Sequence, residues 1–223
     1  MGGAAKLSIH GDNFIGAYCL VSENISMTGY ELRKKDIDVF LSTLKTTPEH
    51  FTLGGSDLIG LFSRVNSNGI LLSNISYSSE VKKIKDKYKD LNVQVLESDL
   101  NAIGNNILLN DKLAIVNPDY KENDLKIMSD IFGVEVLKME IAGYKTVGAH
   151  NILTNKGMVV NNNVEDEEFK KLKEISKNIS QSTANLGSLS IGLCAIANSK
   201  GIIFGKDTSG YEMASIQEGL DIE

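Results

Sequence analysis

The chain has 223 residues, of which 42% are hydrophobic and 23% charged, a balance typical of a globular chain large enough to bury a core. Its 29 acidic residues outnumber its 23 basic residues, and the formal net charge is −6. DNA-binding proteins usually carry a basic surface, because neutralisation of phosphates supplies most of their affinity. The charge therefore argues against DNA as a partner and favours a basic protein.

Membrane-spanning and secreted classes are also disfavoured. The chain has no apolar run approaching the roughly 18 residues that a transmembrane helix needs, and its first residues, MGGAAKLSIH, contain no apolar signal core. Cys19 and Cys194 lie in apolar, strand-like stretches, which favours buried free thiols in a reducing compartment over a disulfide. We therefore expect a cytoplasmic protein.

The sequence repeats itself with a period of 44 residues. Residues 58–72 (LIGLFSRVNSNGILL) are similar to residues 190–204 (SIGLCAIANSKGIIF), which lie 132 residues, or three periods, further on. An Ile-Gly or Val-Gly pair anchors each of five units, with its glycine at Gly16, Gly60, Gly104, Gly148 or Gly192. Such a period indicates a repeat architecture. Five units cover 220 of the 223 residues, so we expect a single domain over residues 1–223.

The predicted strands keep the same order in every unit. The chain begins with an expected strand at residues 6–10. After each anchor glycine we expect a short strand (residues 193–197 in the fifth unit), a polar turn and an apolar return strand, such as residues 70–72 and 202–204. In the second unit Asn68-Gly69 favours a type I′ turn, which needs positive φ at both central residues.

An amphipathic helix follows in each unit, and then a further strand such as residues 93–96. The apolar residues that share one helical face are Ile37, Phe40, Leu41 and Leu44; Val81, Ile84, Tyr88 and Leu91; Leu125, Met128, Ile131 and Phe132; Phe169, Leu172 and Ile175; and Met213, Ile216 and Leu220. Ser209 and Glu212 predict a capping box at the start of the last helix.

The two ends of the chain predict a closed ring. The fifth unit ends after its helix without a final strand, whereas the strand at residues 6–10 is surplus in the first unit. If this strand completes the fifth unit, no sheet edge stays open. Each helix can bury only one face, so the helices should lie outside and the strands inside. The expected fold is an α/β five-bladed propeller with pseudo-fivefold symmetry.

Several polar strings keep a distinctive order and spacing along the whole chain. They are Gly54-Gly55-Ser56 before Ile59-Gly60, Asn66 to Gly69, Ala102 to Asn105, Asn110-Asp111, Asn117 to Asp119, Thr146 to Gly148, Thr154 to Gly157, Thr183 to Asn185, and Asp207-Thr208 with Glu212. Together they resemble the translation initiation factor 6 family, the ribosome anti-association factors. The chain lacks the long polar C-terminal tail of the eukaryotic members and is similar to the archaeal type.

This resemblance implies the pentein fold, which agrees with the ring, and a function without catalysis. Members bind the intersubunit face of the large ribosomal subunit beside the sarcin–ricin loop and obstruct docking of the small subunit. The expected partners are therefore a basic ribosomal protein and the neighbouring rRNA loop, with release by a translational GTPase and an accessory protein. We expect a monomer without a cofactor. Initiation control and large-subunit biogenesis both stay open as the main role.

The contact surface is expected at the end of the ring that presents the anchor turns. Asn105, next to Gly104, matches a position that the family uses at its ribosomal interface. Leu61 is its equivalent in the second unit, where eukaryotic members carry a basic residue. The repeat places Ala17, Ala149 and Leu193 at corresponding positions. For the anchor glycines themselves, a purely structural role is the alternative.

The main alternative is an enzyme. The pentein fold is also that of guanidine-modifying enzymes, which use a cysteine, a histidine and carboxylates. Cys194 and His150 each follow an anchor glycine by two residues and would form an activated thiolate at hydrogen-bond distance. The apolar surroundings of Cys194 argue against this. Three histidines and two cysteines show no ligand spacing, so no metal site is expected. A scaffold without a ribosomal role is the third alternative.

Overall fold

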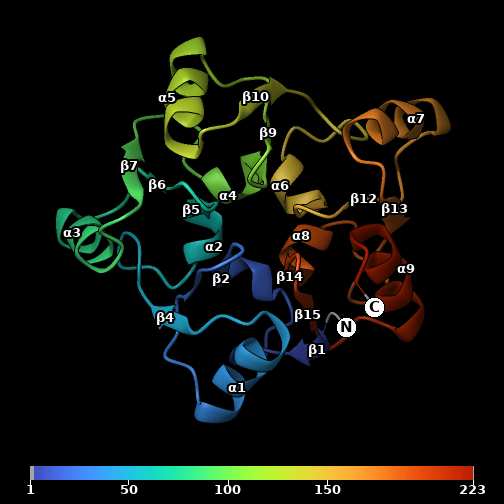
Figure 1. Cartoon of the computed structure of the whole chain (residues 1–223), viewed down its shortest axis with the longest axis horizontal. Coiled ribbons are helices and arrows are strands. Elements are labelled where there is room, and N and C mark those ends of the chain that lie inside the picture. Colours follow the sequence, from blue (N-terminus) through green and yellow to red (C-terminus); the bar gives the residue numbers. More distant parts are fainter. Residues whose placement is uncertain (1–2, 223) are drawn as a thin grey trace.

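The computed structural model describes residues 3–222, which form a mixed α/β fold with five small three-stranded sheets. The sheets surround a common centre and the longer helices lie on the periphery (Figure 1). Each sheet belongs to one 44-residue unit, so the predicted repeat of strands and helices is confirmed.

Every unit consists of a short helix, a hairpin, a long helix and a final strand. Unit one holds η1 (Ile15–Ala17), β2 (Cys19–Val21), β3 (Ser26–Thr28), α1 (Lys34–Thr43) and β4 (Pro48–His50). Unit two holds α2 (Ile59–Phe62), β5 (Ser63–Val65), β6 (Gly69–Ser73), α3 (Ser78–Lys87) and β7 (Asn92–Leu96). Unit three holds α4 (Ile103–Asn106), β8 (Ile107–Leu109), β9 (Leu113–Val116), α5 (Glu122–Phe132) and β10 (Glu135–Lys138). Unit four holds α6 (Val147–His150), β11 (Ile152–Leu153), β12 (Met158–Asn161), α7 (Asp166–Ile175) and β13 (Ile179–Ser182). Unit five holds α8 (Ile191–Cys194), β14 (Ala195–Asn198), β15 (Gly201–Gly205) and α9 (Gly210–Leu220), and its third strand is β1 (Gly3–Leu7).

The middle strand of each sheet pairs antiparallel with its hairpin partner and parallel with the strand that follows the long helix. In unit two, for example, β6 is antiparallel to β5 and parallel to β7. In unit five the parallel partner of β15 is β1, with Gly3 opposite Gly201 and Leu7 opposite Gly205. The predicted completion of unit five by the N-terminal strand is therefore confirmed. The strand lies three residues earlier than predicted, because Ile9 and Asp12 pair across a tight turn.

Two local predictions are wrong. The anchor glycines lie in short helices, so β14 begins at Ala195 after α8 instead of at residue 193. The turn between β5 and β6 is closed by the Asn66 N–H, which donates to the Gly69 carbonyl at 3.1 Å, and neither Asn68 nor Gly69 has positive φ. Glycine is needed at position 69 for space, because a Cβ there would lie 2.9 Å from the Asn92 carbonyl oxygen.

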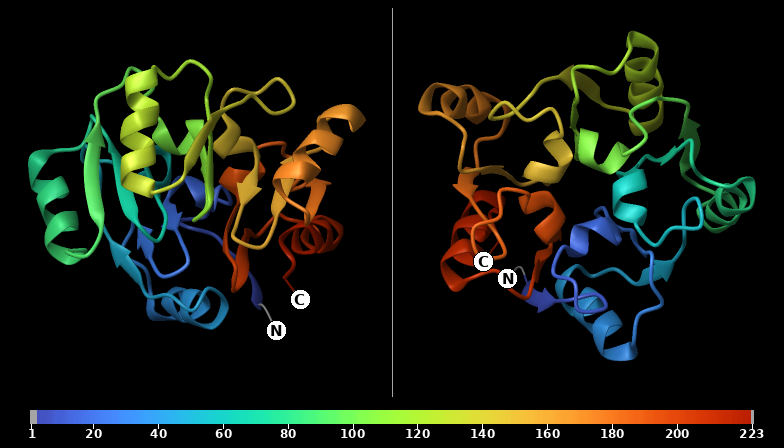
Figure 2. Two further views of the ribbon diagram at one scale, coloured as in Figure 1. Left: turned by 45° about the horizontal axis from the view of Figure 1, so that its top comes forward. Right: turned by 180° about the vertical axis from the view of Figure 1, so that it is seen from behind.

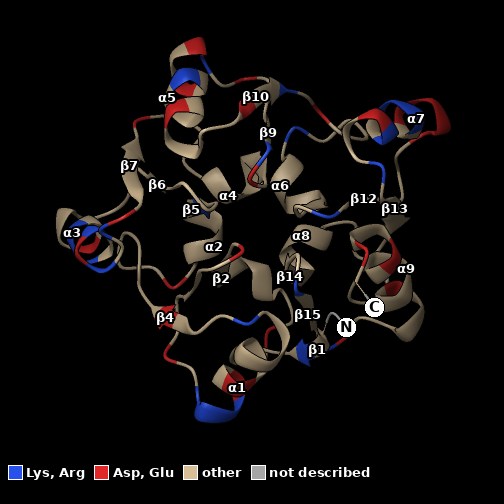
Figure 3. Ribbon diagram, viewed as in Figure 1, with Lys and Arg blue, Asp and Glu red and all other residues tan. Residues whose placement is uncertain are grey.

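The long helices bury the predicted faces, and three of them pack against the sheet of the preceding unit: α1 contacts β1 and β15, α5 contacts β6 and β7, and α9 contacts β12 and β13. Phe40, Met128 and Leu172 are all buried. Leu41, at the border of its helical face, is 42% exposed, contrary to prediction. The helices α1, α3, α5 and α7 carry both acidic and basic residues, whereas α9 carries only acidic ones (Figure 3). Within residues 3–222, no helix has both the length and the apolar character for crossing a membrane.

Candidate functional site

The five anchor glycines contact one another in circular order around the centre. A Cβ at Gly16 would overlap the carbonyl oxygen of Gly192, and a Cβ at Gly60, Gly104, Gly148 or Gly192 would overlap that of the preceding anchor glycine. Only glycine allows the backbones to approach this closely. The short helices therefore surround the centre, as the view from behind shows (Figure 2).

The predicted contact residues lie at equivalent places in these short helices. Ala17 and Ala149 are buried, whereas Leu61, Asn105 and Leu193 are partly exposed. Gly104, the anchor beside Asn105, is buried. The structure thus gives three of the five equivalent side chains some access to solvent. Their role in binding stays a prediction.

Asn105 is the one polar side chain at this repeated position. Its N–H donates to the Ala102 carbonyl at 3.0 Å, which closes the first turn of α4. Its side-chain oxygen is buried and has no hydrogen-bond partner among the described residues. Such an orphaned group costs roughly 1–3 kcal/mol. A polar residue that lowers stability, where other units carry alanine or leucine, is consistent with a role in binding a partner.

Recurring hydrogen bonds within the repeat show which loops share one end of the molecule. Glu80, in the first turn of α3, accepts hydrogen bonds from the N–H groups of Gly54 at 2.6 Å and Gly55 at 3.0 Å. Glu212 in α9 accepts one from Gly187 at 2.9 Å. The loops that lead into the short helices therefore lie beside the loops that lead into the long helices. We call this end the anchor end, and the end with the hairpin turns and the loops after the long helices the hairpin end.

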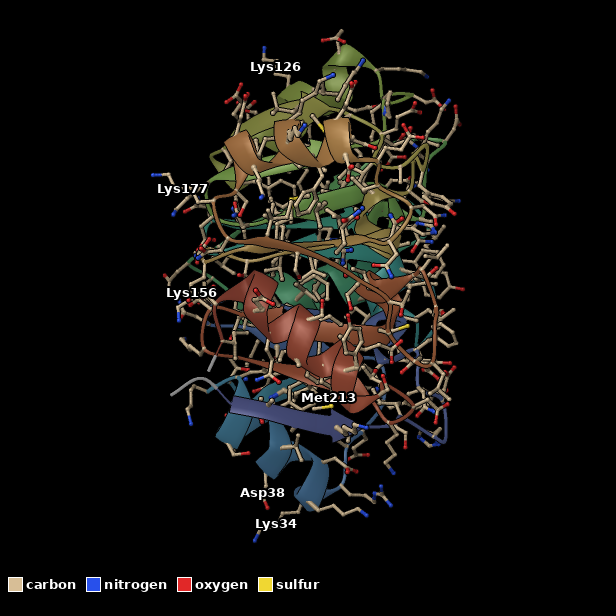
Figure 4. The ribbon with its side chains drawn as sticks, turned by 90° about the vertical axis from the view of Figure 1, so that its right-hand side faces the viewer. Lys34, Asp38, Lys126, Lys156, Lys177 and Met213 are labelled. Carbon is tan, nitrogen blue, oxygen red and sulfur yellow. The ribbon has the colours of Figure 1, made fainter. Side chains whose placement is uncertain are left out.

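The two ends differ in charge. The anchor-end loops carry nine acidic residues, Asp12, Glu31, Asp57, Glu97, Asp99, Asp119, Glu140, Glu165 and Asp207, and four basic ones, Arg33, Lys121, Lys145 and Lys206. The hairpin-end loops carry four acidic residues, Glu23, Asp90, Asp111 and Asp221, and six basic ones, Lys45, Lys89, Lys112, Lys156, Lys177 and Lys200. Lys156 and Lys177 project along the same side of the molecule (Figure 4). The anchor end is therefore the better match for a basic partner.

Arg64 at the centre is a residue that the sequence interpretation missed. It lines a central cavity of about 80 Å³ together with Gly148, Gly192 and residues of every unit. Its Nε donates to the Ile107 carbonyl at 2.8 Å, and its Nη2 donates to the Gly104 carbonyl. Burial lowers the pKa of the guanidinium to about 10, which still leaves it protonated at neutral pH.

The repeat contained a signal for Arg64. The equivalent positions are Leu20, Leu108, Ile152 and Ile196, so a charged residue interrupts an otherwise apolar layer. Its hydrogen bonds reach unit three from unit two, so it joins neighbouring units at the centre.

The geometry does not favour the cysteine–histidine alternative. Cys194 is fully buried, and burial raises its pKa to about 11, so the thiolate is a minor species at neutral pH. The His150 ring stacks on Tyr144 with 4.1 Å between centroids, and its Nδ1 lies 3.1 Å from the Thr146 carbonyl oxygen. Among residues 3–222, no hydrogen bond joins Cys194 to His150, and no group of three or more His, Cys, Asp or Glu is placed to hold a metal.

Comparisons with known proteins match almost the whole chain. The model of the eIF-6 family matches residues 4–219. A protein of Methanocaldococcus jannaschii named translation initiation factor 6 is 39% identical over 214 residues, covering 93% of each chain. Proteins of the same name from Thermoplasma acidophilum and Pyrococcus abyssi are 35% and 31% identical, and the matches cover 96% and 97% of this chain and 98% of each relative.

Proposed function

The chain belongs to the eIF-6 family, and from this premise we propose that it binds the large ribosomal subunit and keeps the small subunit from joining it. The family match over nearly the full length carries the proposal, since it supports a role as a translation initiation factor. The proposed mechanism is steric: the bound protein occupies part of the intersubunit face, and no covalent step takes place.

We also propose that the five sheets form the closed five-bladed ring of the pentein fold. The circular order of contacts among the anchor glycines supports this, and so does the pairing of β1 with β15. A ring of five such sheets leaves only short sheet edges and presents two differently charged ends. A rigid disc of this kind suits a factor that acts by occupying space.

The anchor end is the proposed ribosomal contact. Its loops carry nine acidic and four basic residues, which suits a basic ribosomal protein. Asn105 lies in the short-helix layer of this end and is the one polar side chain at its repeated position, partly exposed to solvent. A stable interface of standard size would bury roughly 1,200–2,000 Å² in total, so the contact should extend from the short helices onto the surrounding loops.

Cosedimentation with separated ribosomal subunits tests the function. The purified protein is expected to pellet with the large subunit alone and to lower the yield of joined ribosomes in a reassociation assay. A protein that pellets with neither subunit, or that leaves subunit joining unchanged when bound, would contradict the proposal.

The contact surface is tested by variants at the two ends. Asn105→Ala is expected to weaken large-subunit binding by about tenfold or more, with no loss of folding stability, because it removes an unpaired polar group. Lys177→Ala removes an exposed charge at the hairpin end and should leave binding unchanged. If Lys177→Ala weakens binding and Asn105→Ala does not, the hairpin end is the contact.

A further inference from the structure

A carboxylate recurs at the third residue of every long helix. The five residues are Asp36, Glu80, Asp124, Glu168 and Glu212, each 44 residues after the last. In the two units where its contacts are most complete, this carboxylate binds the loop that leads into the short helix. The contacts of this carboxylate in units two and five can therefore be compared with those at the equivalent position in the other units.

Unit two shows the full arrangement. Glu80 accepts hydrogen bonds from Thr52 Oγ1 at 2.8 Å, from the N–H groups of Gly54 at 2.6 Å and Gly55 at 3.0 Å, and from the Tyr77 N–H at 2.9 Å. Gly54 and Gly55 both have positive φ, 61° and 71°. Successive N–H groups in such a turn converge on one point and form an anion-binding concavity.

Unit five repeats the arrangement with different residues. Glu212 accepts hydrogen bonds from Thr183 Oγ1 at 2.8 Å and from the N–H groups of Leu186 at 3.3 Å, Gly187 at 2.9 Å and Ser209 at 2.7 Å. In unit four Glu168 accepts from the Ala142 N–H at 3.0 Å. The loop therefore binds a carboxylate in three of the five units.

Unit one has the same donors but a shorter acid. The equivalents of Thr52, Gly54, Gly55 and Tyr77 are Ser8, His10, Gly11 and Arg33, and His10 and Gly11 have positive φ of 50° and 84°. Asp36 stands in the place of the glutamate. It is one methylene shorter, and its Oδ2 instead accepts from Arg33 Nε at 2.9 Å.

The donors of unit one surround a cavity. Within residues 3–222, the Ser8 hydroxyl and the N–H groups of His10, Gly11 and Arg33 have no hydrogen-bond acceptor. These four residues and Asp36 line a cavity of about 290 Å³. Unit three also has an aspartate, Asp124, but residues 96–101 contain no positive φ, so that loop forms no equivalent concavity.

We propose that this unit-one cavity binds a carboxylate of a protein partner, which takes the place that Glu80 occupies in unit two. Its donors are the Ser8 hydroxyl and the backbone N–H groups of His10, Gly11 and Arg33. A singly charged carboxylate fits better than a phosphate, because Glu31 and Asp36 also line the cavity and would repel a dianion more strongly. The carboxylate comes from an Asp or Glu side chain or from a chain terminus. The site is independent of the proposed ribosomal function.

Amide NMR of the intact protein tests the site with three probes at constant ionic strength. Acetate supplies the carboxylate alone, N-acetyl-Ala-Glu-amide supplies it on a side chain, and N-acetyl-Ala-Ala supplies it at a chain terminus. We expect the amide signals of His10 and Gly11 to shift saturably with acetate and with at least one peptide, whose identity gives the source. Chloride should give no saturable shift. Inorganic phosphate should bind more weakly than acetate.

Asp36→Glu is the decisive variant, because it restores the acid of units two and five. It should place the chain's own carboxylate on the loop, raise the midpoint of thermal unfolding and abolish the acetate shifts. Glu31→Gln, the matched control, should keep or strengthen binding because it removes a repelling charge. The proposal is overturned if acetate causes no saturable shift at His10 and Gly11, if phosphate binds more tightly than acetate, or if folded Asp36→Glu still binds acetate as the native protein does.

Discussion

Glu80 and Glu212 are buried carboxylates that tie the anchor-end loops to the long helices. Burial alone would raise the pKa of Glu80, but hydrogen bonds from Gly55, Tyr77, Thr52 and Gly54 outweigh it and hold the pKa below its ordinary value of 4.5. The pKa of Glu212 is lowered in the same way, against its burial, by the hydrogen bonds that it accepts. Each carboxylate therefore stabilises the fold in its ionised form.

The direction of these shifts predicts acid sensitivity. A group with a depressed folded-state pKa contributes stability that is fully present above its unfolded pKa and is lost as the pH falls through the folded-state pKa. The free energy of unfolding should therefore decrease as the pH drops below about 4.5. The double variant Glu80→Gln/Glu212→Gln should be less stable at neutral pH by roughly 1–3 kcal/mol per site, and its stability should depend less on pH in acid.

Urea unfolding at a series of pH values measures both effects. Glu218→Gln, which changes an exposed acid in the same helix as Glu212, is the control and should follow the native protein. If the free energy of unfolding of the double variant falls as steeply with decreasing pH as that of the native protein, other carboxylates cause the acid sensitivity.

At the scale of elements, the packing of the short helices depends on glycine. A Cβ at Gly104 would overlap the Gly60 carbonyl oxygen, which belongs to the backbone of the neighbouring short helix and cannot move independently. Gly104→Ala should therefore destabilise the fold by about 3 kcal/mol. At Gly210, in the first turn of α9, an added Cβ would meet no atom within 4 Å, so Gly210→Ala should be neutral or stabilising by up to about 1 kcal/mol. Urea unfolding of the two alanine variants distinguishes a steric role from a general effect of glycine.

The repeat predicted the number and order of the long helices and sheets because each unit carries the same apolar spacing. It did not predict the short helices, since a four-residue segment such as Ile59–Phe62 is too short to show a helical period. Nor did it predict the positive-φ turn at His10-Gly11, where histidine replaces the glycine of Gly54-Gly55.

The candidate site was predicted less completely. The equivalence of Asn105 and Leu61 follows from the period, whereas their proposed contact with a ribosome rests on family resemblance alone. The unpaired oxygen of Asn105 and the hydrogen bonds of Arg64 across units depend on atomic positions. Arg64 could nevertheless have been identified from the sequence, because it is the one charged residue at a repeated apolar position.

For the whole molecule, the arrangement of contacts between units determines how it unfolds. Neighbouring hairpin turns are linked: the Ser67 N–H donates to Asp111 at 2.7 Å, and the Asp111 N–H donates to Asn155 at 3.0 Å. The Ser199 N–H donates to Glu23 at 3.0 Å, which joins unit five to unit one. In an open repeat array each unit contacts only its neighbours, and terminal units can unfold first. If the ring is closed, every unit has two neighbours, and a single cooperative transition is expected.

The pairing of β1 with β15 provides the test of closure. Gly3 donates to the Lys200 carbonyl at 3.2 Å, and alternate residues of a parallel strand bond to the same partner, so the Ala5 N–H faces β15 and the Ala4 N–H faces away. Ala5→Pro removes a ladder hydrogen bond and should cost about 1–3 kcal/mol, whereas Ala4→Pro should cost less. If closure couples all five units, Ala5→Pro will shift one sharp urea transition to lower concentration with an unchanged slope. A shallower or two-step transition would instead show that units unfold separately once this pairing is weakened.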